Sequence, residues 1–423
     1  DPFGVGGLQR VQHAADDALR LVRVERALPP DALRQALPFE QPGDRVEPFP
    51  VKAEIVDPDD SGVRELAHQA QLAPDTFQRP RGAPLVENLE RHVEPRVDVV
   101  GVCGSDVHMW SGKDPRTPLP MILGHEGVGT VADISGSKQY MNGEDVSAGD
   151  LILWNRGVVC GECYFCRRGE ASLCPDRWAY GIHRSIEERP FLVGCYSDYI
   201  ILDRKTDLLK IGAGHDPALL VSASCSGATT AHAFDVHSPS EGDIVVVQGP
   251  GPVGIFAVAF AARAGADRII VAGGTEGRLA ICRDMGATDI LDRHLMSKKQ
   301  RYEYVMECSS GRGADAVYEC VGNSEVVEEG ISLLRRGGSL ITVGFGAPGG
   351  SVSIDCYKDL TVRNLSLRGV WVSDAGHLEE SLDLVLENEE LFSKLVTHRI
   401  PLQEADKGIS AMQKKNAIKA VLE

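Results

Sequence analysis

The sequence predicts an α/β protein in which a doubly wound parallel sheet is joined to a smaller β-barrel domain. Between residues 217 and 369, apolar β-branched runs alternate with helical stretches of about 10 to 15 residues, which indicates a parallel sheet with helices on both faces. Residues 97–216 instead carry short β runs separated by glycine turns, which favours a small barrel. A chain of 423 residues is also too long for one ordinary core.

The first 96 residues match neither pattern. They are rich in Arg, Asp, Pro, His and Leu, sustain no strand alternation, and contain only isolated helix-like stretches at 14–26 and 62–72. A lineage-specific or poorly ordered extension and a mis-assigned start or reading frame are both open explanations. Only residues 96–100, with the sequence RVDVV, predict a strand that leads into the barrel.

The remaining strands and helices are predicted from hydrophobic periodicity and from the glycine and proline residues that interrupt it. Strands are predicted at 127–134, 150–154 and 197–203 in the barrel, and at 244–248, 268–272, 315–322 and 339–345 in the parallel sheet. Helices are predicted at 253–264, 278–285 and 324–334. A tail from residue 370 holds two more helices, at 377–387 and 402–414, and a closing strand at 418–423. These patterns divide the chain into segments 1–96, 97–216, 217–369 and 370–423.

The charge and cysteine content restrict the partners and the compartment. A formal net charge of −17 disfavours nucleic acid and anionic membranes, because both would repel the protein. No apolar run approaches the roughly 20 residues of a membrane helix, and the first residues hold no apolar signal core. Eleven cysteines in a chain of this length indicate thiols and metal ligands, so we expect a reducing cytoplasm.

Four of the cysteines form one local metal motif. Their spacing is C-x2-C-x2-C-x7-C, and they are Cys160, Cys163, Cys166 and Cys174. Four thiolates on a tight loop complete a tetrahedral shell and leave no open position, which is typical of structural zinc. We therefore expect this lobe to stiffen the barrel domain without taking part in chemistry.

A second set of metal-type residues lies between 103 and 126. Cys103 offers a thiolate, and 22 residues later His125 and Glu126 offer an imidazole and a carboxylate; between them lie Ser105, Asp106 and His108. Sulfur and imidazole are ligands that Zn²⁺ prefers, and a zinc ion held by few protein ligands keeps a position open for substrate. This set predicts a catalytic zinc, hence two zinc ions per chain.

A glycine-rich turn predicts a dinucleotide site. It directly follows the apolar run 244–248 and opens a helix, and it consists of Gly249, Pro250, Gly251, Pro252, Val253 and Gly254. In that setting glycines let the backbone approach a pyrophosphate at the helix N-terminus. The acid expected to bind the ribose is missing near Ala272 and Gly273, so Thr275 and Arg278 are candidates for a 2′-phosphate, which favours NADP(H). Glu276 keeps NAD(H) open.

The run GVCGSDVH followed by PLPMILGHEGVG resembles the zinc-dependent medium-chain alcohol dehydrogenase family. The likeness extends from about Val97 to the C-terminus. It implies a GroES-like catalytic domain at 97–216, a Rossmann domain at 217–369, and a tail that returns to the catalytic domain. It also implies a dimer or tetramer assembled through the edge of the Rossmann sheet, for which residues 365–372 are the candidate strand, although that strand could equally be core.

The resemblance also implies roles for single residues. It supplies Cys225 as the third protein ligand of the catalytic zinc beside Cys103 and His125, where the alternative is an ordinary buried cysteine at a helix start. Asp106 would accept the free N–H of His125, with a turn or capping role as the alternative. Glu126 would be an outer residue or a transient ligand. A proton relay would use Ser105 and His108, unless His108 is simply solvated.

Together these features predict a zinc-dependent oxidoreductase that transfers hydride between a small-molecule alcohol, or its aldehyde or ketone, and NADP or NAD. A hydrolytic zinc enzyme is a rival reading, but it would have no use for a dinucleotide domain. A non-catalytic homologue that only binds dinucleotide and zinc is the other. The unmatched first 96 residues favour that homologue, and the intact Cys103, His125 and Glu126 set argues against it.

Overall fold

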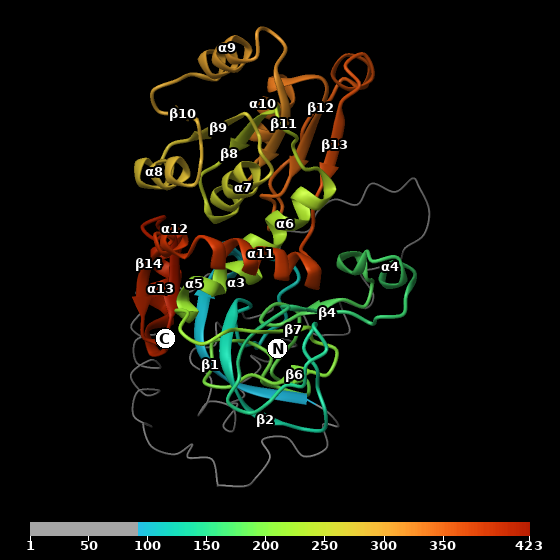
Figure 1. The fold of residues 1–423 in the computed structure, drawn as a ribbon, viewed down its shortest axis with the longest axis vertical. Helices are drawn as coiled ribbons and strands as arrows, with labels where there is room; N and C mark the ends of the chain where they lie inside the picture. Colours follow the sequence, from blue (N-terminus) through green and yellow to red (C-terminus); the bar gives the residue numbers. More distant parts are fainter. Residues whose placement is uncertain (1–91) are drawn as a thin grey trace, which may run out of the picture.

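The computed structural model describes residues 92–423, and the features predicted within 1–91 lie outside that range. Two sheets organise the chain (Figure 1). Every helix within residues 92–423 is too short or too polar to cross a lipid bilayer.

The first sheet belongs to the barrel domain. Its strand order is β14-β15-β1-β2-β3-β7, and β6 also pairs with β1. The bounds are β1 His92–Val102, β2 Gly127–Ile134, β3 Leu151–Trp154, β6 Leu202–Asp203, β7 Leu208–Lys210, β14 Val396–Ile400 and β15 Lys419–Leu422. A separate two-stranded sheet joins β4 Gly157–Val158 to β5 Trp178–Ala179. The C-terminal strand β15 pairs antiparallel with β1, so the tail completes the domain that the chain entered first.

Two barrel strands differ in length from the predictions. The strand predicted at 96–100 begins four residues earlier, at His92, and continues to Val102. The strand predicted at 197–203 is reduced to Leu202–Asp203. The hydroxyl of Ser197 donates to the carbonyls of Gly194 and Tyr199, at 2.8 and 2.7 Å. Tyr199 still forms an isolated bridge with Arg96, but the N–H of Ile201 donates to the carbonyl of Leu192, so the ladder is interrupted before β6.

The second sheet is the predicted parallel one. Its order is β10-β9-β8-β11-β12-β13, and all of its pairs are parallel. The bounds are β8 Ile244–Gln248, β9 Arg268–Gly273, β10 Asp289–Asp292, β11 Ala314–Glu319, β12 Leu334–Thr342 and β13 Ser366–Gly369. The order is that of a doubly wound dinucleotide fold, whose crevice opens at the carboxyl ends of β8 and β11.

Helices cover both faces of this sheet. They are α7 Pro252–Arg263, α8 Glu276–Asp284, α9 Lys298–Cys308 and α10 Ser324–Leu333. Along β8, Val245 and Val247 pack in one core cluster with α7, and Ile244 and Val246 pack in another with α9 and α10. This alternation explains why β8 reads as a continuous apolar run. The sequence patterns did not predict α9 and β10, because these elements bury few apolar residues. Val305 in α9 and Leu291 in β10 are the buried apolar ones.

The remaining helices lie in the barrel domain, the tail and the linker between the sheets. They are α3 Gly104–Trp110, α4 Tyr164–Arg167, α5 Pro217–Leu220, α6 Ser226–Val236, α11 Ala375–Glu387, α12 Glu389–Ser393 and α13 Ala405–Gln413, with short turns η1 Ala171–Leu173, η2 Val221–Ser224, η3 Cys356–Thr361 and η4 Leu402–Glu404. Helices α6 and α11 lie between the two sheets (Figure 1). One core cluster runs from Val128 in β2 through these helices to the parallel sheet, so the two domains share a core.

Candidate metal centres and cofactor site

Three separate segments bring four metal-type side chains together. Cys103 precedes α3, His125 and Glu126 precede β2, and Cys225 separates η2 from α6. One ligand atom from each of these four residues lies within 4.8 Å of the others. Cys225, for which the sequence left an ordinary core role open, therefore lies beside the pair that the motif supplied.

The spacing of these atoms fits a tetrahedral zinc ion. The sulfurs of Cys103 and Cys225 are 3.8 Å apart, and the Cys225 sulfur is 3.6 Å from Nε2 of His125. With zinc bonds of about 2.3 Å to sulfur and about 2.0–2.1 Å to nitrogen, tetrahedral angles require about 3.8 Å and about 3.5–3.6 Å for these pairs. The three side chains therefore fit zinc without rearrangement.

The two thiols share their protons unequally. The pKa of Cys103 lies well below its ordinary value, chiefly because of its hydrogen bond with Cys225. The pKa of Cys225 lies well above it, because of the same bond and because of burial. A cation bound between the two sulfurs would stabilise both groups as thiolates.

Asp106 connects two of the candidate ligands. Its Oδ2 accepts a 2.8 Å hydrogen bond from the backbone N–H of Cys103, and its Oδ1 lies 3.3 Å from Nδ1 of His125. Burial by itself lowers the pKa of His125, but Asp106 and Cys103 more than compensate and raise it to about 10. A carboxylate that accepts a hydrogen bond from Nδ1–H leaves Nε2 of the same histidine free to bind a metal. Asp106 lies where it would do this for His125.

Glu126 has a partner that the sequence analysis missed. Its Oε2 accepts a hydrogen bond of 2.6 Å from Nζ of Lys419, and both side chains are buried. Its Oε1 has no hydrogen-bond partner. A Cβ at Gly101 would lie 2.1 Å from Oε2, so only glycine leaves room for the carboxylate there. The one signal in the sequence is a lysine inside the apolar closing strand.

Ser105 and His108 lie three residues apart on α3, and successive residues at this spacing share a helix face. A Cβ placed on Gly346 would lie 3.6 Å from Oγ of Ser105. The loop after β12 of the parallel sheet therefore approaches α3, and the serine stands where the two domains meet.

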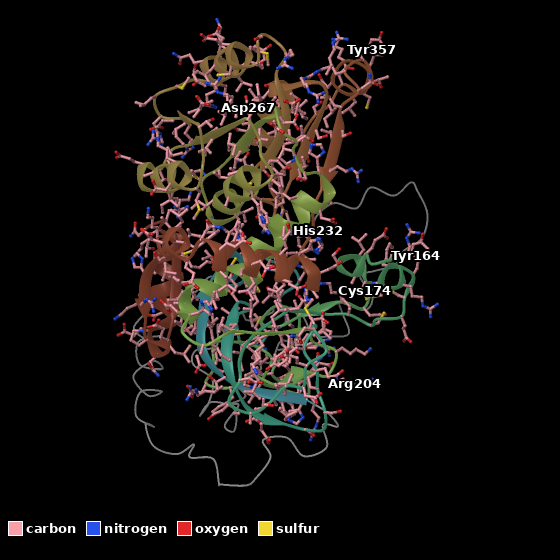
Figure 2. The ribbon with its side chains drawn as sticks, in the orientation of Figure 1. Tyr164, Cys174, Arg204, His232, Asp267 and Tyr357 are labelled. Atoms are coloured by element: carbon pink, nitrogen blue, oxygen red, sulfur yellow. The ribbon has the colours of Figure 1, made fainter. Side chains whose placement is uncertain are left out.

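The four-cysteine lobe projects from the side of the barrel domain, where Figure 2 labels Tyr164 and Cys174. All four sulfurs lie within 4.8 Å of one another. Backbone N–H groups of Cys160, Cys163 and Cys166 already point at neighbouring sulfurs, at 3.3–3.5 Å. Both the spacing and these N–H bonds suit thiolates around a closed zinc site.

The glycine turn lies at the carboxyl end of β8 and opens α7, as the fingerprint predicts. Gly249 has a φ of +100°, in the region that favours glycine, and a Cβ on Gly254 would lie 1.8 Å from the Gly249 carbonyl oxygen. A Cβ on Gly251 would contact nothing, so that position is open toward the crevice. Pro252 and Val253 form the first turn of α7.

The residues beside Gly274 differ in part from those predicted. Thr275 occupies the N-cap position of α8 without a side-chain hydrogen bond to the helix, and Nη2 of Arg278 donates a 2.6 Å hydrogen bond to the Ala417 carbonyl. Two basic residues that follow β10 approach Gly274 instead: a Cβ there would lie 2.5 Å from Nε of Arg293 and 2.6 Å from Nε2 of His294. The sequence did not single them out because β10 itself was not recognised.

Comparison with known proteins decides the family. An alcohol dehydrogenase GroES-like domain model matches residues 90–213, and a zinc-binding dehydrogenase model matches residues 252–387. A 5-exo-hydroxycamphor dehydrogenase of Pseudomonas putida is 30% identical over 332 residues, which cover 78% of this chain and 90% of the relative. The chain belongs to the zinc-dependent medium-chain alcohol dehydrogenase family. The predicted fold of a Rossmann sheet with a GroES-like domain is thereby confirmed.

Solved members of this dehydrogenase family extend the comparison. An alcohol dehydrogenase of Thermotoga maritima shares 44% sequence identity with a TM-score of 0.77, covering 80% of this chain and 93% of that one. A zinc-binding dehydrogenase of Sinorhizobium meliloti, solved with NADP, shares 26% identity with a TM-score of 0.69, covering 80% and 94%. The protein is therefore an oxidoreductase of a family that uses zinc and a nicotinamide cofactor.

Proposed function

We propose that this dehydrogenase oxidises an alcohol, or reduces the corresponding carbonyl, at a zinc ion held by Cys103, His125 and Cys225. The observation that supports the proposal most directly is the spacing of their ligand atoms beside a domain with a dinucleotide fingerprint. A zinc ion there would polarise the substrate oxygen and lower the pKa of its hydroxyl group. The nicotinamide would exchange hydride with the carbon that bears this oxygen.

The protein groups around the site have separate tasks. Asp106 holds His125 in the tautomer that presents Nε2, and it fixes the Cys103 backbone. Ser105 accepts the proton of the substrate hydroxyl while it passes its own hydroxyl proton on, and His108 on the same helix face delivers a proton to solvent. Glu126 is a buried acid beside the metal site; burial raises the pKa of its carboxyl group, and the charge of Lys419 opposes this rise.

The cofactor we propose is NADP(H). Residues 273 and 274, where an acid would bind the ribose hydroxyl, are both glycine. Arg293 and His294 approach Gly274. Thr275 and Arg278 remain candidates for the same phosphate. NAD(H) is the alternative, with Glu276 at the first position of α8 as the ribose acceptor. The pyrophosphate would lie over Gly249, Gly251 and Gly254, against the N-terminus of α7.

We also propose a homodimer or homotetramer formed through β13, because this strand is the edge of the parallel sheet and is largely exposed. A cytoplasmic location is consistent with the eleven cysteines, all of which are free thiols.

Zinc content and turnover on one preparation test the main proposal. We expect two zinc ions per chain by mass spectrometry and NADPH-linked reduction or NADP-linked oxidation with an alcohol panel. One chelator-resistant zinc without turnover would contradict the proposal and would favour the non-catalytic homologue.

A further inference from the structure

Arg156 is a buried guanidinium without an acidic partner among residues 92–423. Its side chain is 5% exposed, and its Nη2 donates a 2.9 Å hydrogen bond to Oγ1 of Thr229. Its Nε is buried and has no hydrogen-bond partner. A buried charge normally has an ion partner or a full set of hydrogen bonds, because burying it otherwise costs several kcal/mol, on the order of a protein's whole stability. The absence of an acidic partner for Arg156 therefore requires an explanation.

This guanidinium lies close to the candidate metal centre. Thr229, which holds it, is in the first turn of α6, and its backbone N–H donates to the carbonyl of Cys225 at 2.9 Å. Four residues of α-helix rise about 6 Å, so Arg156 is about one helical turn from a candidate zinc ligand. A group bound by Arg156 would thus be a few atoms away from an oxygen bound at the metal.

A second incompletely bonded guanidinium lies next to the first. Nη2 of Arg177 is buried without a hydrogen-bond partner. The same atom would lie 2.3 Å from a Cβ on Gly157, so Arg177 packs against the residue that follows Arg156. Burial and then the charge of Arg156 lower the pKa of Arg177 to about 10. Two neighbouring guanidinium groups of like charge, each with a buried nitrogen that has no hydrogen-bond partner, are a combination that an anion would satisfy.

The other charged groups nearby already have partners. Arg116 forms a bidentate pair with Asp114, at 2.9 and 2.6 Å, and its guanidinium lies 4.8 Å from the ring centre of Trp371. Asp374 opposes the charge of Arg177. Arg156 has no acidic side chain as an ion partner among residues 92–423, and its charge opposes the raised pKa of the Cys225 thiol, which confirms that it lies near this candidate ligand.

We propose that Arg156, assisted by Arg177, binds an anionic group of the substrate, so that the preferred substrates are alcohols that carry a carboxylate or a phosphate. This inference rests on the proposed dehydrogenase function. The metal end of the site takes the hydroxyl and the guanidinium end takes the anion, which orients the substrate between the two domains. Planar guanidinium groups bind both carboxylate and phosphate through paired N–H bonds.

Matched substrate pairs test the proposal on the zinc-loaded full chain. The pairs are 4-hydroxybutyrate with 4-hydroxybutyramide, and glycerol phosphate with glycerol, with kcat/KM measured for each. We expect the charged member of at least one pair to be preferred by about 100-fold or more, because an unfilled buried donor strongly rejects the neutral analogue. The pair that shows the preference tells carboxylate from phosphate. Turnover of charged and neutral members within about threefold of each other would overturn the proposal.

Variants assign the preference to the guanidinium. Arg156→Gln should lose the preference, with kcat/KM falling about 100-fold for the charged substrate and changing less than about threefold for the neutral one. Arg204→Gln is the matched control, because Arg204 is an exposed arginine of the barrel domain (Figure 2). Equal losses for both substrates would mean a structural role and would overturn the proposal. If Arg156→Gln does not fold, Arg177→Gln is used instead. The comparison of charged with neutral substrates on the wild-type protein tests the proposal in either case.

A binding measurement separates this inference from the proposed function. Succinate and inorganic phosphate should raise the Tm of the wild-type protein and not that of Arg156→Gln. Each anion is added at about 10 mM, which is on the order of the Kd of a weak site. If no alcohol is oxidised while this shift is present, the dehydrogenase proposal fails and the anion site stands. If neutral alcohols are oxidised and neither anion shifts the Tm, the anion site fails and the dehydrogenase proposal stands.

Discussion

Lys419 and Glu126 form a buried ion pair directly beside the candidate metal site. Nζ of Lys419 lies 2.6 Å from Oε2 of Glu126, and the side chains are 1% and 0% exposed. The two residues are 293 positions apart, so the pair joins the C-terminal strand β15 to the segment that carries His125. It fixes the tail of the chain to the metal site.

Removing the lysine should therefore destabilise the fold. In Lys419→Met the Glu126 carboxylate stays buried without its counter-charge, and we expect the free energy of unfolding to fall by about 3–5 kcal/mol in urea titrations. The double variant with Glu126→Gln should recover a large part of the loss, because the uncompensated charge is gone. Lys407→Met, which breaks an exposed pair with Glu404, is the control and should cost under about 1 kcal/mol. A loss in Lys419→Met no larger than in this control would contradict the buried-pair argument.

The two candidate zinc sites should be separable by single thiol substitutions. Cys225→Ser should leave one zinc per chain, abolish turnover and keep the fold, because the four-cysteine lobe is independent of Cys225. Cys163→Ser should instead lose the other zinc and lower the Tm, because a closed structural site contributes folding energy. Cys356→Ser, at an exposed thiol, is the control and should retain both ions. Elemental analysis that finds two zinc ions in Cys225→Ser would remove this residue from the ligand set.

The glycine turn offers a test that separates folding from cofactor binding. In Gly254→Ala the new Cβ would lie 1.8 Å from the Gly249 carbonyl, so the cofactor-free protein should lose about 1–3 kcal/mol or more. In Gly251→Ala the new Cβ contacts no protein atom, so stability should stay unchanged while the Kd for the cofactor rises about tenfold, since that space faces the pyrophosphate. Calorimetry on both variants checks the contrast, and equal cofactor affinity in wild type and Gly251→Ala would place the dinucleotide elsewhere.

Cofactor choice should depend on Arg293. Arg293→Ala is expected to lower kcat/KM with NADPH by about 10- to 100-fold and to leave the value with NADH nearly unchanged, because only the former carries the 2′-phosphate. Arg278→Ala should have a smaller effect, since one of its nitrogens is already held by the Ala417 carbonyl. Steady-state kinetics with both cofactors provide the comparison. A wild-type enzyme that prefers NADH would favour Glu276 as the ribose acceptor.

His183 should make the fold sensitive to mild acid. Burial, followed by the charges of Arg116 and Arg177, lowers the pKa of this histidine from 6.5 to about 4. Between these two values the unfolded chain binds a proton that the folded protein does not, so stability must fall as the pH drops from about 6.5 to about 4. In His183→Gln this contribution is absent, and the difference between the two urea midpoints should shrink with falling pH. A difference that is constant across this range would contradict the lowered pKa.

Local patterns were sufficient for much of the architecture. The cysteines of the lobe lie within 15 residues of one another, so their spacing alone brings the sulfurs together. The fingerprint turn and the buried strand before it are contiguous, and burial on both faces forces the continuous apolar run of β8. Strand β10 and helix α9 escaped prediction because they bury few apolar side chains, so their periodicity is weak.

The composition of the sites was decided by tertiary structure. Cys225 is 122 residues from Cys103, and only packing of α6 against the barrel shows that their sulfurs lie 3.8 Å apart. The contact of Lys419 with Glu126 likewise joins segments 293 residues apart. Arg293 beside Gly274 and the unpartnered Arg156 are visible only from the packing of loops and side chains. Spacing along the chain specifies which neighbours a residue has within a few turns. Contacts between distant segments depend on how whole faces pack, and no short pattern of residue types encodes them.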